Sequence, residues 1–240
     1  MKAQERHHLK QNEFVSSVAD ATSWYRTNQS TVIGGIVAVV AVAVLASGYF
    51  WWKGRAEEQS GSLLGVAMTV YQAPIVPPSS VPGATQAAGS YPTEKARAEA
   101  ALTAFQQVYS AYPSSTAGIA AKYHSAEVLL SLGRKDEAQK AYEEVIANAG
   151  GSIYGPVAKL GLATALLANG KGDQAVKTFE ELAANRDGAV PVDGVLMQLA
   201  AAYKQLGKNQ EARTTYKRVV DEFPDSPYVQ SARQQMTLLG

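Results

Sequence analysis

A repeat of 37 residues in the C-terminal part of the sequence constrains the fold more than any other feature. Three copies have a Gly, an Ala five residues later, an aromatic residue four after that, and a Val or Leu three further on, and an earlier fourth copy has all of these except the Gly. A fixed period of this length indicates a repeat architecture, in which each unit buries its apolar face only against its neighbours. The repeated positions are Gly133, Gly170 and Gly207; Ala101, Ala138, Ala175 and Ala212; Phe105, Tyr142, Phe179 and Tyr216; and Val108, Val145, Leu182 and Val219.

The spacing of these residues predicts two helices joined by a short turn in every unit. The Gly supplies the left-handed backbone that ends a first helix. The Ala lets the second helix approach the first closely, and the two larger side chains follow one and two turns later on the same face. We therefore expect an all-α fold. Near the end of the chain, Ser226 can cap a helix and Pro227 suits its first turn, which predicts a C-terminal capping helix.

An uncharged stretch of 21 residues, 32–52, precedes the repeats. A helix of this length crosses the hydrocarbon core of a bilayer, about 30 Å thick. The stretch ends in the bulky sequence YFWW instead of a small-residue cleavage site, which favours an uncleaved signal anchor over a cleaved signal peptide. We expect residues 31–53 to form a single transmembrane helix, with residues 32–52 in contact with the lipid bilayer.

The basic residues around this span predict its orientation. Four Lys or Arg residues precede the span, and two follow it within the next twenty residues. Because positively charged flanks stay on the cytoplasmic side, we expect a cytoplasmic N-terminus. In a bacterium this places a single-pass protein in the inner membrane with its C-terminal domain in the periplasm.

The sequence before the span predicts a further helix. Apolar or aromatic side chains recur there at intervals of 4, 3 and 4 residues, at Phe14, Val18, Ala21 and Tyr25, which is the stripe of an amphipathic helix. The predicted parts of the chain are residues 1–30, a cytoplasmic segment with this helix; 31–53, the transmembrane helix; 54–93, an atypical first helix and a Pro-rich loop; and 94–240, the repeat domain with its capping helix.

The repeat resembles the tetratricopeptide repeat, whose hairpin carries a turn Gly, an Ala, an aromatic residue and a terminal Pro. The terminal position holds Pro113 and Pro224 in two copies but Gly150 and Asp187 in the middle ones. The period of 37 residues exceeds the usual tetratricopeptide period of about 34. The resemblance covers about residues 94–240 and implies an α-solenoid of helix-turn-helix units.

The layout of one membrane span before a repeat domain, with HHLKQNEF near the start, is similar to that of bitopic tetratricopeptide proteins of bacterial inner membranes. One branch of that family is an ancillary subunit of the Sec translocon that contacts periplasmic chaperones. The resemblance implies a scaffold or chaperone-like accessory near protein secretion, with membrane-complex or translocon proteins and periplasmic clients as partners. A fixed structural subunit of an energy-transducing or envelope assembly is the alternative.

Neither the composition nor the motifs of the sequence indicate a catalytic site. The formal net charge of +1 lacks a basic excess for nucleic acid, and the absence of cysteine excludes disulfides and thiolate metal sites. His7 and His8 are neighbours that point about 100° apart on a helix, and a structural role is expected for His124. The glutamate pairs 143–144 and 180–181 suit a solvated face. We expect no enzyme activity, cofactor, metal, nucleic acid or small-molecule substrate.

Protein binding is the remaining function class, and the first helices of the hairpins are its expected site. Stacked hairpins present these helices on a concave side, and the resemblance places partner contacts at set positions along them. The set is mostly apolar, so a groove for an extended or helical segment is one hypothesis and internal packing is the other. The candidate partner-binding residues are Tyr123, Glu127, Leu130, Leu160, Thr164, Leu167, Met197, Lys204 and Gln205.

Overall fold

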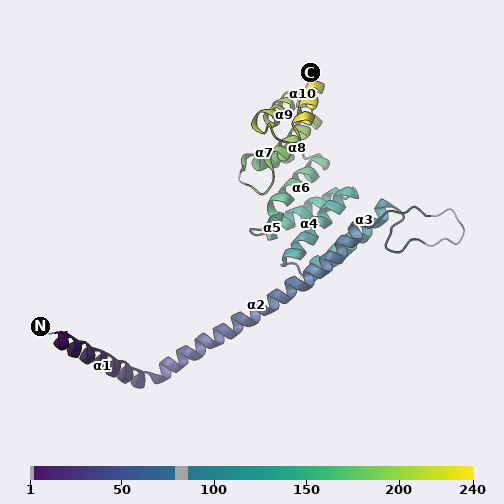
Figure 1. Cartoon of the computed structure of the whole chain (residues 1–240). Coiled ribbons are helices and arrows are strands. Elements are labelled where there is room, and N and C mark those ends of the chain that lie inside the picture. The colour runs from purple at the N-terminus through teal and green to yellow at the C-terminus, as the bar shows by residue number, and fades with distance from the viewer. Residues whose placement is uncertain (1–2, 79–85, 187) are drawn as a thin grey trace. The chain divides into compact units, whose positions relative to one another are not determined.

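The computed structural model describes residues 3–78, 86–186 and 188–240, with side chains from Val15 onward. The described residues form ten α-helices and no β-strand, which confirms the all-α prediction (Figure 1). The helices are α1 (Ala3–Thr27), α2 (Gln29–Tyr71), α3 (Glu94–Ala111), α4 (Thr116–Ser131), α5 (Lys135–Asn148), α6 (Tyr154–Ala168), α7 (Gly172–Ala184), α8 (Val192–Gln205), α9 (Asn209–Glu222) and α10 (Val229–Leu238).

The chain divides into two compact units, Met1–Arg55 and Ala56–Gly240. Helix α2 has 43 residues, so the apolar stretch and the predicted atypical first helix belong to one uninterrupted helix. No proline occurs in the sequence before Pro74, and the glycines of α2 have room around them and helical backbone. Nothing in the local sequence therefore ends the helix after residue 53.

The three glycine turns of the repeat adopt the predicted conformation. Gly133, Gly170 and Gly207 have φ values of 74°, 75° and 73°. In each turn the residue after the glycine donates its backbone N–H to the carbonyl five residues earlier, at 2.9 Å. This is the bond of a Schellman cap, and glycine allows it because a Cβ disfavours left-handed backbone. The turns join α4 to α5, α6 to α7 and α8 to α9.

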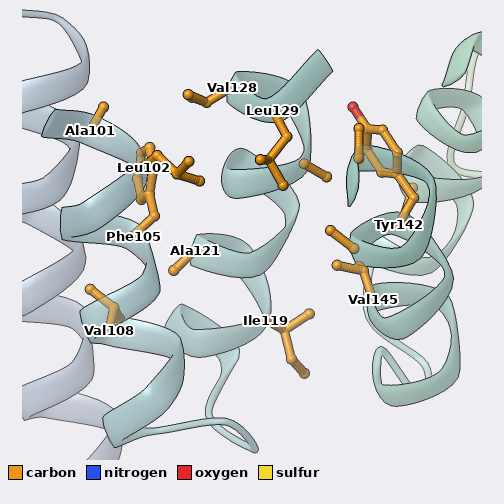
Figure 2. Packing of buried hydrophobic residues seen from close by; sticks show 14 of the residues in the cluster. Ala101, Leu102, Phe105, Val108, Ile119, Ala121, Val128, Leu129, Tyr142 and Val145 are labelled. Carbon is orange, nitrogen blue, oxygen red and sulfur yellow. The ribbon is translucent and has the colours of Figure 1, made fainter. Parts of the chain in front are cut away.

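The repeated Ala and aromatic side chains form the core, as predicted. Ala101, Ala138, Ala175 and Ala212 are each 0% exposed, and the aromatic residues one turn later are at most 3% exposed. Figure 2 shows Phe105 and Val108 of α3 facing Ala121 of α4, with Tyr142 and Val145 of α5 on the other side of α4. Each hairpin therefore packs through the same positions, and helices α3 to α10 stack in chain order (Figure 1).

The end of α2 belongs to this stack as the first helix of an additional hairpin. Ala67 is 1% exposed, and the ring of Tyr71 lies 5.8 Å from that of Phe105, between centroids. The carboxylate of Glu57 accepts the backbone N–H of Thr116 at 3.1 Å. A Pro-rich connection replaces the glycine turn here, and its base is closed by the N–H of Tyr91, which donates to the carbonyl of Pro74 at 3.0 Å.

Polar side chains also tie successive hairpins together. Lys171 donates to Gln139 at 2.8 Å, and Lys208 lies 3.1 Å from Asp173 one repeat later. Near the C-terminus Glu222 accepts from Arg218 at 2.7 Å and pairs with Arg186 from the loop before α8. These contacts are largely solvent-exposed, so each contributes little next to the buried core.

The first prediction concerns Gly161 of α6. A Cβ at this position would lie 2.3 Å from Cε1 of Tyr142, whose ring is 2% exposed and cannot move away. We expect Gly161→Ala to lower the free energy of unfolding by about 1–3 kcal/mol, measured by urea denaturation. Gly155→Ala in the same helix is the matched control, because its Cβ meets only Ala149 at 3.5 Å. Equal stability of the two variants would contradict this packing.

The second prediction concerns pH. The hydrogen bond from Arg218 lowers the pKa of Glu222 below its ordinary value of 4.5, and Arg186 adds to the effect. The ionised Glu222 therefore stabilises the folded state fully above the pKa that it has in the unfolded chain. This stabilisation is lost as the pH falls through the lower pKa of Glu222 in the folded state. We expect Glu222→Gln to cost about 0.5–1 kcal/mol at neutral pH and progressively less below about pH 4.5, measured by denaturation at each pH.

The matched control for this pH series is Glu181→Gln, because Glu181 forms no ion pair in the part of the chain that the structure describes. We expect its effect on stability to stay constant across the same pH range. A Glu222→Gln difference that is unchanged between pH 7 and acid would show that the two arginines do not stabilise the carboxylate.

Candidate protein-binding surface

The nine candidate residues lie on the first helices of three successive hairpins. Helices α4, α6 and α8 each contribute three of them, and the period of 37 residues places them in columns. The columns are Tyr123, Leu160 and Met197; Glu127 and Thr164; and Leu130, Leu167 and Lys204, with Gln205 beside the last.

The structure divides this set by exposure. Thr164, Lys204 and Gln205 are exposed. The five apolar or aromatic members are partly buried, and each packs against a hydrophobic core cluster with part of its side chain. The surface therefore combines half-buried apolar side chains with exposed polar ones. Part of each apolar side chain packs inside the domain, and the rest is exposed.

Tyr123 and Glu127 are held by contacts within the domain. The Tyr123 hydroxyl donates to Oε1 of Glu127 at 3.0 Å, and Nδ1 of His124 lies 2.7 Å from Oε2 of the same carboxylate. Burial and the negative charge of Glu127 raise the pKa of Tyr123, so the hydroxyl keeps its proton. The Tyr123 ring also contacts Tyr142 and Tyr154, with centroids 6.0 and 5.8 Å apart. This end of the surface is preorganised and has few free polar groups.

His124 packs within the domain. Its ring stacks on Phe105 at 5.4 Å between centroids and lies 6.1 Å from the ring of Tyr71. The sequence predicted a structural role for this residue, and these contacts agree with it. Among the described residues, no group of three or more His, Cys, Asp or Glu side chains could hold a metal ion.

At the other end of the surface, a groove of about 500 Å³ lies between α8 and α10. Met197, Lys204 and Gln205 line one side of it, and Ser231 and Gln235 line the other. The Nζ of Lys204 donates to Oε1 of Gln235 at 2.9 Å. The contribution of α10 was not predicted from the sequence, because that helix lies outside the repeat pattern and its register could not be read from the period.

Comparison with known proteins places this geometry in a family. The sequence model of the family described as Tetratricopeptide repeat-like domain matches residues 22–237. No curated protein matches the sequence. Among solved structures, the putative kinesin light chain TPR-like repeats of Podosopora anserina align with a TM-score of 0.57, covering 76% of this chain and 86% of that chain at 17% identity.

Two further structures give similar alignments. A form of the same repeats with a single substitution has a TM-score of 0.58 at 17% identity, covering 76% of this chain and 85% of that chain. MamA has a TM-score of 0.48 at 15% identity, covering 60% of this chain and 78% of that chain. At this identity the kinesin light chain structures support the fold alone. Because the family model matches most of the sequence, the chain belongs to the family of tetratricopeptide repeat-like domains.

Proposed function

We propose that the protein is a membrane-anchored protein–protein interaction module in a bacterial inner membrane. Residues 32–52 cross the bilayer with the N-terminus in the cytoplasm, and the repeat domain lies in the periplasm. There it serves as a scaffold or chaperone-like accessory near protein secretion, in contact with a membrane complex or translocon and with periplasmic clients. The coarser part of this function, a module for protein partners, follows from the tetratricopeptide-like fold.

The main support for a membrane anchor is the exposure of the apolar part of α2. Its most apolar window of 18 residues has a mean hydropathy of 2.4, and 0% of that window is buried. Val37, Leu45 and Phe50 are 61%, 74% and 69% exposed. A core helix of a water-soluble domain would be covered by other elements, so an apolar stretch of this length with no cover favours a lipid environment.

The interfacial residues and the extent of the family match support the same proposal. Tyr49, Trp51 and Trp52 lie at the end of the apolar stretch, and the guanidinium of Arg55 lies over the Trp51 ring at 5.5 Å. Aromatic and basic side chains in this order suit the boundary between lipid and water. The family match begins at residue 22, so the apolar stretch lies inside the matched region.

For the partner, the nine candidate residues favour an apolar segment. Half-buried Leu160, Leu167 and Met197 can contact such a segment at little cost in side-chain entropy, and Met197 can adapt its shape. The groove between α8 and α10 extends this surface. An accessory near secretion meets extended apolar segments before they fold, which is the chemistry that this surface fits.

The third prediction tests binding on this surface. We expect a photoreactive amino acid at Thr164 of the full-length protein, in intact membranes, to crosslink many substrates that exchange during a chase. A photoreactive residue at exposed Lys140 on α5 is the control and should yield far less product. Recovery of one stoichiometric membrane protein that survives detergent purification would instead identify a fixed subunit of a membrane complex and contradict the accessory role.

The fourth prediction tests orientation. Alkaline phosphatase folds only where its disulfides form, so it reports a compartment outside the cytoplasm. We expect activity when it is fused after Gly240 of the full chain, and none when it is fused to a chain ending at Thr27, before the span. An inactive full-length fusion at normal abundance would reverse the proposed orientation.

A further inference from the structure

A second groove, of about 410 Å³, lies between α7 and α9 on the face formed by the second helices of the hairpins. None of the nine candidate residues lines it. Leu199 and Tyr203 of α8 form part of its lining with Ala183 of α7, and Thr214 of α9 contributes from the other side. This groove is therefore distinct from the predicted partner-binding surface.

The repeat period shows how this junction differs in sequence from the earlier ones. In the register of 37 residues, Ala183 of α7 corresponds to Tyr109 of α3 and Ile146 of α5. Thr214 of α9 corresponds to Lys140 of α5 and Lys177 of α7. Each earlier junction between second helices thus carries a bulky apolar side chain and a lysine. At the junction of α7 and α9 both are replaced by small side chains.

The bulky residues at the earlier junctions contact the domain itself. Ile146 is partly buried and packs against the core cluster of the first hairpins. The ring of Tyr109 lies under the Nζ of Lys122, which is 4.7 Å from the ring centroid. Ala183 has no such bulky side chain and is 5% exposed where it lines the groove, so an external side chain can lie beside it.

The charges around the groove select the chemistry of that occupant. Glu180 and Glu211 both line the groove, and neither forms an ion pair within the described ranges. The Glu180 side chain contacts Tyr203, whose hydroxyl donates to Oε1 at 2.6 Å. Burial and this carboxylate raise the pKa of Tyr203 to about 12, so the phenol adds no negative charge of its own.

The one basic side chain in the lining has its charge engaged elsewhere. Arg218 donates to Glu222 at 2.7 Å, and that carboxylate also pairs with Arg186. The groove thus joins an apolar surface to two carboxylates that no cation of the described residues neutralises. A ligand with an apolar side chain next to a positive charge complements both features.

We propose that this groove binds a protein segment that presents a side chain of the size of Ile or Leu beside a Lys or Arg. The apolar side chain packs against exposed Ala184 and half-buried Tyr203, next to Ala183, and the cation lies between Glu180 and Glu211. The partner thus supplies the pair that Ile146 and Lys177 supply at the preceding junction. This second surface adds to the proposed function but does not depend on it, because it uses different residues on different helices.

The fifth prediction tests this groove with the full-length protein in phosphatidylcholine nanodiscs. The probe is a fluorescent eight-residue peptide alternating Ile and Lys, followed by anisotropy, with empty nanodiscs as the reference. We expect saturable binding that weakens as salt rises, since the contact is partly electrostatic. A peptide with Glu in place of Lys, and one with Ala in place of Ile, should not bind.

Variants of the protein test whether the peptide binds in this groove. Ala183→Ile installs the residue of the preceding repeat. It should lower the affinity for the peptide at least about tenfold, because the Ile side chain occupies the space that the apolar side chain of the peptide would take. Thr214→Lys supplies the missing cation from an exposed position and should also weaken binding. The double change Glu180→Gln with Glu211→Gln should remove the salt dependence. Glu181→Gln removes a carboxylate that does not line the groove, so it is the control and should bind as the wild type does.

The outcomes separate this proposal from the one for the first helices. Circular dichroism confirms that each variant is folded, and Thr214→Lys keeps the test decisive if Ala183→Ile perturbs the core. Absence of saturable binding above empty nanodiscs, or wild-type affinity in both variants, would overturn the proposal. Loss of crosslinking at Thr164 with intact peptide binding would count only against the proposed function.

Discussion

The close contact that a recurring alanine allows between paired helices is the constraint on which the repeat domain depends. Ala101, Ala138, Ala175 and Ala212 have no exposed surface, and each lies one turn before a buried aromatic ring. A larger side chain at any of them would separate the helices and leave a gap beside the ring. Because each hairpin contacts mainly its neighbours, this distance also sets where the next hairpin can pack.

The same backbone unit presents different surfaces because the requirements of the core leave the outer positions free to vary. On the first helices, one column changes from Tyr123 to Leu160 to Met197, although each of the three packs against a core cluster. On the second helices, Ala183 takes the place of Ile146 and lines a groove. Binding in such a fold is therefore determined by positions outside the repeat motif, which is why membership of the family names no partner.

Helix α2 joins two stretches of different composition in one continuous element. Its apolar stretch is uncharged, and 0% of its most apolar window is buried, which is the pattern expected of the proposed membrane span. Further along, Ser60 and Ala67, seven residues apart, are the buried residues of α2, as in a helix that packs on one face. The backbone stays helical from one part to the other, so composition alone separates them.

Sequence by itself determined the local rules of this protein. The period of 37 residues fixed the glycine turns, the buried alanines and rings, and the all-helical class, because each depends on backbone conformation and side-chain size within one hairpin. It also placed the nine candidate residues on three first helices. Only the tertiary structure decided how far each of them is buried, and that the Tyr123 hydroxyl donates a hydrogen bond to Glu127. It alone revealed the grooves beside α10 and between α7 and α9, because a groove depends on side chains from separate helices, whose distances no single repeat encodes.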